Sequence, residues 1–480
     1  MSLSDAPAPG APATPPPTAN TGALSAMGAM FQDTDDNRVV PRKQIYSWAL
    51  WDWATQPFNS VLLTFVFASL YLVSDNFLPA DVAGLANDDP LKQSAMATLT
   101  SGYGLATFIA GILILILAPV LGQQADRRGN KKRGLMLFTA LLALAQFALF
   151  FVHADPSYFW FGAIVLSLGA VVAEIAGVNY NSMLVQISTP RTVGRVSGLG
   201  WGMGYIGGIV ALTLVVVLTT FNWFGMDTSD GMAYRLVAVG CGVWTIVFSI
   251  PIFLNVPEAP ARMGAARVGF FRSYVVLVQD ITRLYKNHRP TFWFLVSSAV
   301  YRDGLAGVFA FGGILAAVVF GFTPTEVMIF GIAANVVAGI STILAGRADD
   351  RFGARSVIVT ALTGLVTIAL LLFFFRDVGT IVFWVGGLLL SAFVGPAQAA
   401  SRSLLARVTP TGMQGEIFGL YATTGRVMSF LSPWLWAAFI GWFGATHFGV
   451  LGITIVLLAG LLLMLFLVPA RAKGGARIDA

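Results

Sequence analysis

Five ionisable residues lie inside long apolar stretches of this chain, where charged side chains are costly. They are Asp52, Glu174, Arg302, Asp303 and Arg426. A charge that is removed from water must pair, bind a ligand or change its protonation state. The three acids and two bases nearly balance, so we weigh structural ion pairs equally with roles in ligand binding or proton transfer.

Glu174 has the strongest case for reversible proton binding, because it is the one charged residue of the run Ala170–Val178. Burial disfavours the ionised form of a carboxyl group. Arg302 could hold a solute carboxylate, since a guanidinium can donate two parallel hydrogen bonds to it. On a helix the adjacent Arg302 and Asp303 point about 100° apart, so we expect at least one of them to contact another helix.

Three uncharged amides, Asn59, Asn181 and Gln398, could hydrogen-bond a polar solute. Packing between helices is the better explanation for any one of them alone. The chain has a single cysteine, Cys241, and three histidines, so we expect no disulfide, no metal site and no histidine-based catalytic centre. It contains no phosphate-binding loop of the G-x-x-x-x-G-K-[ST] type. We therefore expect neither an enzyme nor an ATP-driven pump, and no cofactor.

The elements that must position these side chains follow from composition. The chain is 56% hydrophobic and 11% charged, whereas soluble domains carry about 25% charged residues, so the surplus apolar surface must face lipid. Twelve runs reach the roughly 20 residues that a membrane-spanning helix needs, which favours helices over shorter barrel strands. They are Ile45–Val73, Ala97–Gly122, Gly134–Val152, Tyr158–Ile187, Gly194–Leu218, Leu236–Val256, Thr291–Phe320, Thr325–Ala345, Ser356–Phe375, Thr380–Val408, Gly415–Phe443 and His447–Val468.

The net charge of +6 does not indicate a nucleic-acid partner, because the basic residues are sorted by position. Most of those outside the runs lie in the tails and in alternate turns, with Lys92, Arg235 and Arg376 as exceptions. Arg402 and Arg407 are counted with the turn after the tenth run. This asymmetry predicts that these turns and both termini are cytosolic.

Two of these turns share the pattern G-x-x-x-D-R-x-G-x-[K/R] at a spacing of 224 residues. The first contains Gly122, Asp126, Arg127 and Gly129, and the second contains Gly346, Asp350, Arg351 and Gly353. A Thr-Pro pair followed by a glycine-containing segment repeats at 220 to 221 residues, at Thr189 and Gly194 and again at Thr409 and Gly415. The chain therefore reads as a duplicated six-helix unit, with an axis along the membrane normal relating the halves.

The repeated pattern has a physical interpretation. Its first glycine lets one helix approach another closely, and its second can adopt a backbone conformation that other residues avoid. Its acid can lie at a helix N-terminus, where the helix dipole favours negative charge. We interpret the paired turns as latches that hold the cytosolic side closed.

The predicted fold is an all-α membrane protein with twelve transmembrane helices in two pseudo-symmetric six-helix bundles. Phe271, Val275 and Val278 recur at helical spacing beside basic residues, which predicts an interfacial helix between the bundles. The predicted organisation is a disordered cytosolic tail at 1–44, a first bundle at 45–257, a cytosolic linker with the interfacial helix at 258–290, a second bundle at 291–470 and a cytosolic tail at 471–480.

The paired turns resemble the signature loop of the major facilitator superfamily of secondary transporters. A narrower resemblance, to the branch of the autophagy-linked vacuole effluxers and their bacterial relatives, rests on Trp48–Ala54, Asn179–Ser182, Gly194–Trp201, Tyr301–Gly304 and Gln398–Leu404. Trp51 and Arg302 depart from the Tyr and Asn that usually precede the two acids in that branch. The resemblance implies that helices 1, 4, 7 and 10 line a central cavity, which would place Asp52, Glu174, Arg302 and Asp303 on cavity helices.

From these observations we expect a secondary active transporter that moves a small solute by alternating access, coupled to a proton or cation. The resemblance suggests an amino acid or related metabolite, moved outward. Flipping of a lipid or amphiphile is the alternative on the same fold. We expect a monomeric multi-pass protein of the plasma membrane, with the bilayer and the solute as its partners and no nucleic acid.

If Glu174 carries the coupling proton, Glu174→Gln should abolish transport that a pH gradient drives, because an amide cannot bind and release a proton. The measurement is solute uptake by reconstituted vesicles with and without the gradient. Full gradient-driven transport by Glu174→Gln would show that another group couples the proton.

Overall fold

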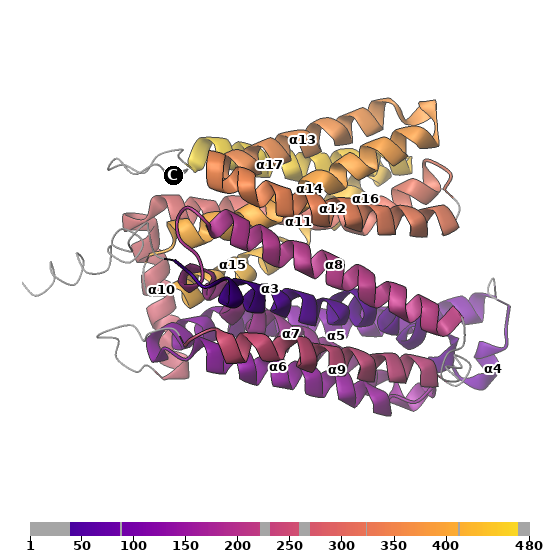
Figure 1. Cartoon of the computed structure of the whole chain (residues 1–480). Coiled ribbons are helices and arrows are strands. Elements are labelled where there is room, and N and C mark those ends of the chain that lie inside the picture. Colours follow the sequence, from indigo (N-terminus) through magenta and orange to yellow (C-terminus); the bar gives the residue numbers. More distant parts are fainter. Residues whose placement is uncertain are drawn as a thin grey trace, which may run out of the picture.

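The computed structural model describes residues 39–86, 89–220, 231–258, 269–322, 324–410 and 413–468, and the bundles within them are helical (Figure 1). The first half contains α3 (Arg42–Pro57), α5 (Pro90–Arg128), α6 (Lys131–Ala148), α7 (Phe159–Ser182), α8 (Val193–Thr220) and α9 (Met232–Asn255). The second contains α11 (Arg289–Val318), α12 (Pro324–Phe352), α13 (Ala354–Phe374), α14 (Thr380–Val408), α15 (Gln414–Met428), α16 (Leu431–Phe443) and α17 (Gly449–Leu467).

The two halves lie side by side with their helices running along a common direction, and the colours run from indigo through magenta in the first half and from salmon through orange to yellow in the second (Figure 1). Ten of the helices in the described residues are long and apolar enough to cross a membrane. The predicted all-α membrane fold is therefore confirmed. The remaining two of the twelve predicted spans, the first and the eleventh, are present but interrupted.

The first span is interrupted at Pro57, where α3 ends. Proline lacks the N–H that would bond to the carbonyl four residues back, and the indole of Trp244 in α9 donates to the freed Trp53 carbonyl at 3.2 Å. The chain continues in wider π-helical turns, η1 (Phe58–Phe65) and η2 (Phe67–Leu72). The carbonyl group that Pro57 leaves without its helical partner therefore accepts a hydrogen bond from a neighbouring helix and contributes to packing.

The eleventh span is broken between α15 and α16. At the break, the Asp303 carboxylate accepts a hydrogen bond from the backbone N–H of Ser432, with Oδ2 and N separated by 2.6 Å. A carboxylate at a helix N-terminus satisfies a free N–H and complements the helix dipole. Asp303 is 5% exposed and its carboxylate caps α16, while a role for it in solute binding or coupling stays a prediction.

Helices α5 and α12 extend past their predicted ends at Gly122 and Ala345. Most of each repeated pattern therefore lies in the last helical turns and not in the connecting turn, because nothing before the second glycine breaks the helix. Gly129 and Gly353 end the two helices with φ of 62° and 88°. This left-handed conformation favours glycine, which confirms the predicted role of the second glycine.

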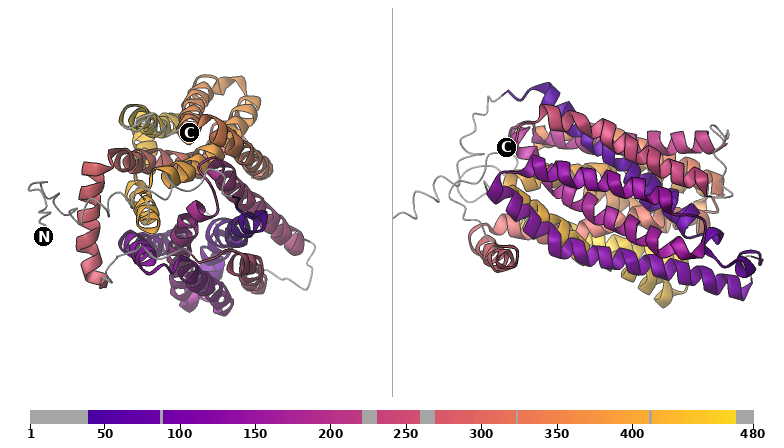
Figure 2. Two further views of the ribbon diagram at one scale, coloured as in Figure 1. Left: turned by 60° about the vertical axis from the view of Figure 1, so that its left-hand side comes forward. Right: turned by 90° about the horizontal axis from the view of Figure 1, so that it is seen from below.

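Between the halves, α10 (Phe270–Asn287) lies across one end of the bundle, apart from the spans (Figure 2). Ser273, Leu277 and Leu284 are buried against the protein, while Phe271 and Val278 are exposed. The amphipathic helix is as predicted, and its contact with lipid stays a prediction. Residues 1–38, 259–268 and 469–480, which hold most of the predicted tails and part of the linker, lie outside the described residues.

We call the end of the bundle at which α5, α7, α12 and α14 finish the basic end, because its turns carry arginine and lysine. The other end is the opposite end.

Candidate functional site

A cavity of about 210 Å³ lies between the two halves. Helices α7 and α8 form its wall on one side, and α11, α14 and α15 form the other. Its lining residues are Glu174, Val178, Asn181, Trp201, Arg302, Gln398, Arg402, Phe418, Tyr421 and Ala422. The structure thus brings together four of the predicted site residues, Glu174, Asn181, Arg302 and Gln398.

Two other predicted residues lie elsewhere. Asn59 is an exposed residue of η1, and its backbone carbonyl accepts a hydrogen bond from the Thr64 hydroxyl. Asp52 does not line the cavity and sits behind Arg402, which does.

Arg402 is the centre of the polar contacts on the side of the cavity that faces the basic end. It projects from α14 of the second half and is 4% exposed. Its Nη1 donates to Asp52 Oδ2 at 3.2 Å and to Asn181 Oδ1 at 2.9 Å. Its Nε and Nη2 donate to the hydroxyl and the carbonyl of Ser197 at 3.0 and 2.7 Å. All four hydrogen bonds end on residues of the first half.

Aromatic rings of the first half surround the same guanidinium. Its carbon lies 4.9 Å from the ring centroid of Trp48 and 5.7 Å from those of Tyr180 and Trp201. Tyr180 also donates its hydroxyl to Asp52 at 2.9 Å. A cation gains energy from such rings when it is shielded from water. A Cβ at Gly200 would lie 2.7 Å from Arg402 Nη2, so a glycine is needed here.

The sequence analysis missed this role, because it counted Arg402 and Arg407 with a cytosolic turn. Both lie within α14, and their side chains are only 5% and 7% exposed. The sequence nevertheless contains features that point to Arg402 as a residue of the site. The pair of serines around Arg402 belongs to a segment that resembles the transporter family, and Arg402 is four residues beyond the cavity candidate Gln398, one helical turn away.

Two of the predicted charged residues, Arg302 and Glu174, line the cavity itself. The Arg302 guanidinium stacks on Tyr421, 3.8 Å from the ring centroid, and donates to the Tyr421 carbonyl at 2.9 Å. Glu174 has no basic neighbour in sequence but pairs in space with Arg426 at 3.3 Å. Their side chains are 31% and 42% exposed, so neither is the deeply buried charge that the sequence suggests.

At the basic end, the first repeated pattern joins α5 to α15 of the other half. Asp126 is 3% exposed and accepts a hydrogen bond from the backbone N–H of Glu416 at 2.9 Å. Lys131 pairs with the same carboxylate at 2.7 Å. A Cβ at Gly122 would clash with the Gly415 carbonyl oxygen, so the two helices touch through backbone.

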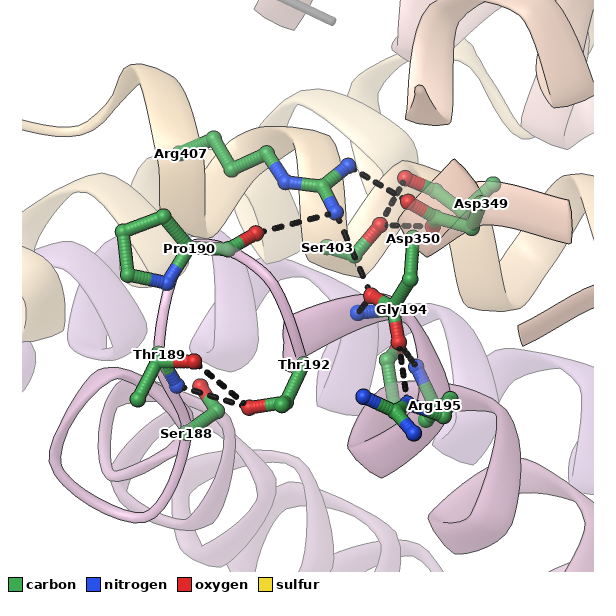
Figure 3. A network of polar contacts seen from close by, with 12 residues as sticks. Ser188, Thr189, Pro190, Thr192, Gly194, Arg195, Asp349, Asp350, Ser403 and Arg407 are labelled. Atoms are coloured by element: carbon green, nitrogen blue, oxygen red, sulfur yellow. Dashed lines mark hydrogen bonds and ion pairs between the residues drawn. The ribbon is translucent and has the colours of Figure 1, made fainter. Parts of the chain in front are cut away.

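The second repeated pattern makes the equivalent contact between α12 and α8 (Figure 3). Asp350 accepts from the backbone N–H groups of Gly194 and Arg195 at 2.7 and 3.1 Å. Arg407 pairs with Asp349 at 2.5 Å and reaches Asp350 at 3.5 Å. A Cβ at Gly346 would lie 2.7 Å from the Gly194 carbonyl oxygen.

Each patterned acid therefore caps the first turn of a helix that belongs to the other half, as the dipole argument predicts. The arginines of the pattern behave differently. Arg351 is exposed and stacks on its neighbour Phe352 at 5.2 Å, so it does not join the halves as expected. Arg127 is half-buried and has contacts of its own. The cations beside the two acids are instead Lys131, Arg195 and Arg407.

Solved structures share this architecture. The E. coli fucose:proton symporter FucP superimposes with a TM-score of 0.65 at 13% identity, covering 88% of this chain and 97% of that one. The human organic anion transporter MFSD10 gives a TM-score of 0.66 at 15% identity, covering 88% and 99%. This chain therefore has the fold of these proteins, a multi-pass bundle of apolar helices in two halves that are joined by paired contacts.

A sequence profile described as "Vacuole effluxer Atg22 like" matches residues 40–477, and the chain belongs to this family. The uncharacterized MFS-type transporter YxiO of Bacillus subtilis (strain 168) is 25% identical over 430 residues, which cover 88% of this chain and 94% of the relative. The resemblance found in the sequence is thereby confirmed for the superfamily and the branch.

Removing Arg402 should destabilise the protein more than removing a surface arginine. Breaking a buried ion pair costs about 3–5 kcal/mol, and we expect the lower end for Arg402→Gln because the Asp52 side chain is 22% exposed. The measurement is the apparent unfolding temperature of the purified protein in detergent. The double variant Asp52→Asn with Arg402→Gln should recover part of the loss.

The matched control is Arg376→Gln, since its partner Asp377 is 83% exposed and surface pairs contribute up to about 1 kcal/mol. Equal unfolding temperatures for Arg402→Gln and Arg376→Gln, or no recovery in the double variant, would contradict the arrangement.

Proposed function

We propose that this chain is a secondary active transporter that moves a small solute by alternating access, with the basic end facing the cytosol. The observation that carries the proposal is the cavity between two halves that are joined on one side of it by matched contacts. Alternating access needs a central site whose access changes when one half rocks against the other.

The contacts below the cavity correspond to the closed cytosolic side of that cycle. Opening this side separates α5 from α15 and α8 from α12, and draws Arg402 out of its site in the first half. Asp52, Asp126 and Asp350 then lose partners together. Water entering between the halves solvates these carboxylates, which lowers the cost of the opened state.

The solute is small. The cavity of about 210 Å³ is below the roughly 300–1,000 Å³ of sites for drug-sized ligands. An amino acid or related metabolite fits this limit, and the family description supports outward transport. Proton coupling, which the name of FucP states for that protein, is proposed here with Glu174 as the carrier.

Flipping of a lipid remains the second candidate on this fold. Five of the lining side chains are charged or carry an amide, which suits a polar solute better than acyl chains.

Transport is tested with the purified full chain in vesicles. Vesicles that contain the protein are incubated with a metabolite mixture that includes amino acids, and the contents are compared with those of protein-free vesicles. We expect selective movement of one small-solute class that a pH gradient accelerates. Movement of a fluorescent lipid, with no small solute transported, would replace the proposal with the flippase alternative.

The latches are tested by the accessibility of a cysteine placed between the halves. Ile343 is half-buried in α12, and a Cβ at Gly202 of α8 would lie 2.7 Å from its side-chain Cδ1. In an Ile343→Cys protein, Asp126→Ala and Asp350→Ala should each raise labelling by a membrane-impermeant maleimide severalfold, because each removes a cap that joins the halves. The native Cys241 is buried and contributes little background.

Asp155→Ala serves as the control, because Asp155 is in the turn between α6 and α7 and caps a short turn there at the opposite end. Unchanged labelling in both latch variants would show that these acids do not hold the basic end closed.

A further inference from the structure

The charges around the cavity do not cancel. Asp52 is paired with Arg402 and Glu174 with Arg426. In the described structure, Arg302 has no carboxylate partner, and its contacts are the ring and the carbonyl of Tyr421. The lining therefore has one unmatched positive charge.

The orientation of Arg302 leaves one edge of the guanidinium available. Its Nη1 donates to the Tyr421 carbonyl, and the stacked ring of Tyr421 fixes the plane of the group. The other edge, formed by Nε and Nη2, has no acceptor among the described residues. Two parallel N–H groups at such an edge match the two oxygens of a carboxylate.

One further lining group can donate a hydrogen bond to an anion. The Gln398 amide is half-buried in the wall of the cavity. Trp201 also lines the cavity, but its indole N–H is shielded from solvent and therefore does not face the open volume. The free edge of Arg302 and the Gln398 amide are the donors that a bound anion reaches.

The rest of the lining is apolar and aromatic. Phe418, Val178 and Ala422 lie beside Tyr421 around the same cavity. A solute with one anionic group and an apolar body of a few carbons matches this division of the lining.

We propose that the cavity binds an organic monoanion, with its carboxylate on the free edge of Arg302 and its apolar body against Phe418 and Tyr421. Among the amino acids and related metabolites of the proposed function, this favours a carboxylate without an ammonium group, because an ammonium would need a carboxylate that is not already engaged by arginine. The inference rests on the proposed function in taking this cavity as the solute site, and it narrows the solute to a charge class.

The test is equilibrium binding to the purified full chain in detergent, measured by calorimetry. The probes share one ring and differ in charge: benzoate, neutral benzamide, cationic benzylamine and zwitterionic phenylglycine. Acetate and isobutyrate extend the carboxylates to smaller sizes, and sodium chloride at the same concentration controls for ionic strength. We expect at least one carboxylate to bind at least about tenfold more tightly than benzamide, since hydrogen bonds to charged groups are worth more than neutral ones.

Two arginine variants sharpen the test. Arg302→Gln should weaken carboxylate binding about tenfold or more, and Arg302→Lys should restore only part of it, because an ammonium group lacks the bidentate edge. Arg426→Gln is the matched variant, since it also removes one arginine but frees Glu174 from its ion pair. It should shift preference from benzoate toward phenylglycine.

The inference would be overturned if the unaltered chain bound benzamide or phenylglycine more tightly than benzoate, acetate and isobutyrate. The absence of carboxylate binding, or equal carboxylate affinity in the Arg302→Gln protein, would also overturn it. These outcomes are distinct from failure of the proposed function, in which vesicles with the protein move no solute although the purified chain still binds the anion.

Discussion

The structure depends on the need to compensate a guanidinium that is removed from water. Arg402 belongs to the second half, but its hydrogen bonds and aromatic contacts are all made by the first half. Neither half alone offers it this environment. Because an uncompensated buried charge costs several kcal/mol, the halves are held together at this level whenever the cavity above is closed from the basic end.

The two latches add a second, more distributed constraint. Close backbone contact at Gly122 and Gly415, and again at Gly346 and Gly194, brings helix ends of opposite halves together. The acid of each pattern then caps the facing helix, so packing and electrostatics favour the same arrangement. The repeated pattern supplies two such contacts, and Arg402 adds a further contact between the halves.

The two halves use their charged residues differently, and these differences determine the charge of the cavity. Asp52 and Asp303 lie in α3 and α11, the first helices of the two halves, yet one joins Arg402 while the other caps the broken eleventh span. Arg302 beside Asp303 faces the cavity, because neighbouring helical residues point in different directions. The unmatched charge therefore appears on one side of the cavity, where it can distinguish solutes by their charge.

The sequence by itself determined the helices, the duplication and the latch acids, because hydropathy, basic turns and spacing are local properties of the chain. It also identified Glu174, Asn181, Arg302 and Gln398, which line the cavity. Partners were decided only by tertiary structure: Arg426 for Glu174, Arg402 for Asp52 and Ser432 for Asp303. These pairs are 129 to 350 residues apart. Which charge faces which is set by helix rotation and packing across the halves, and no local pattern encodes it.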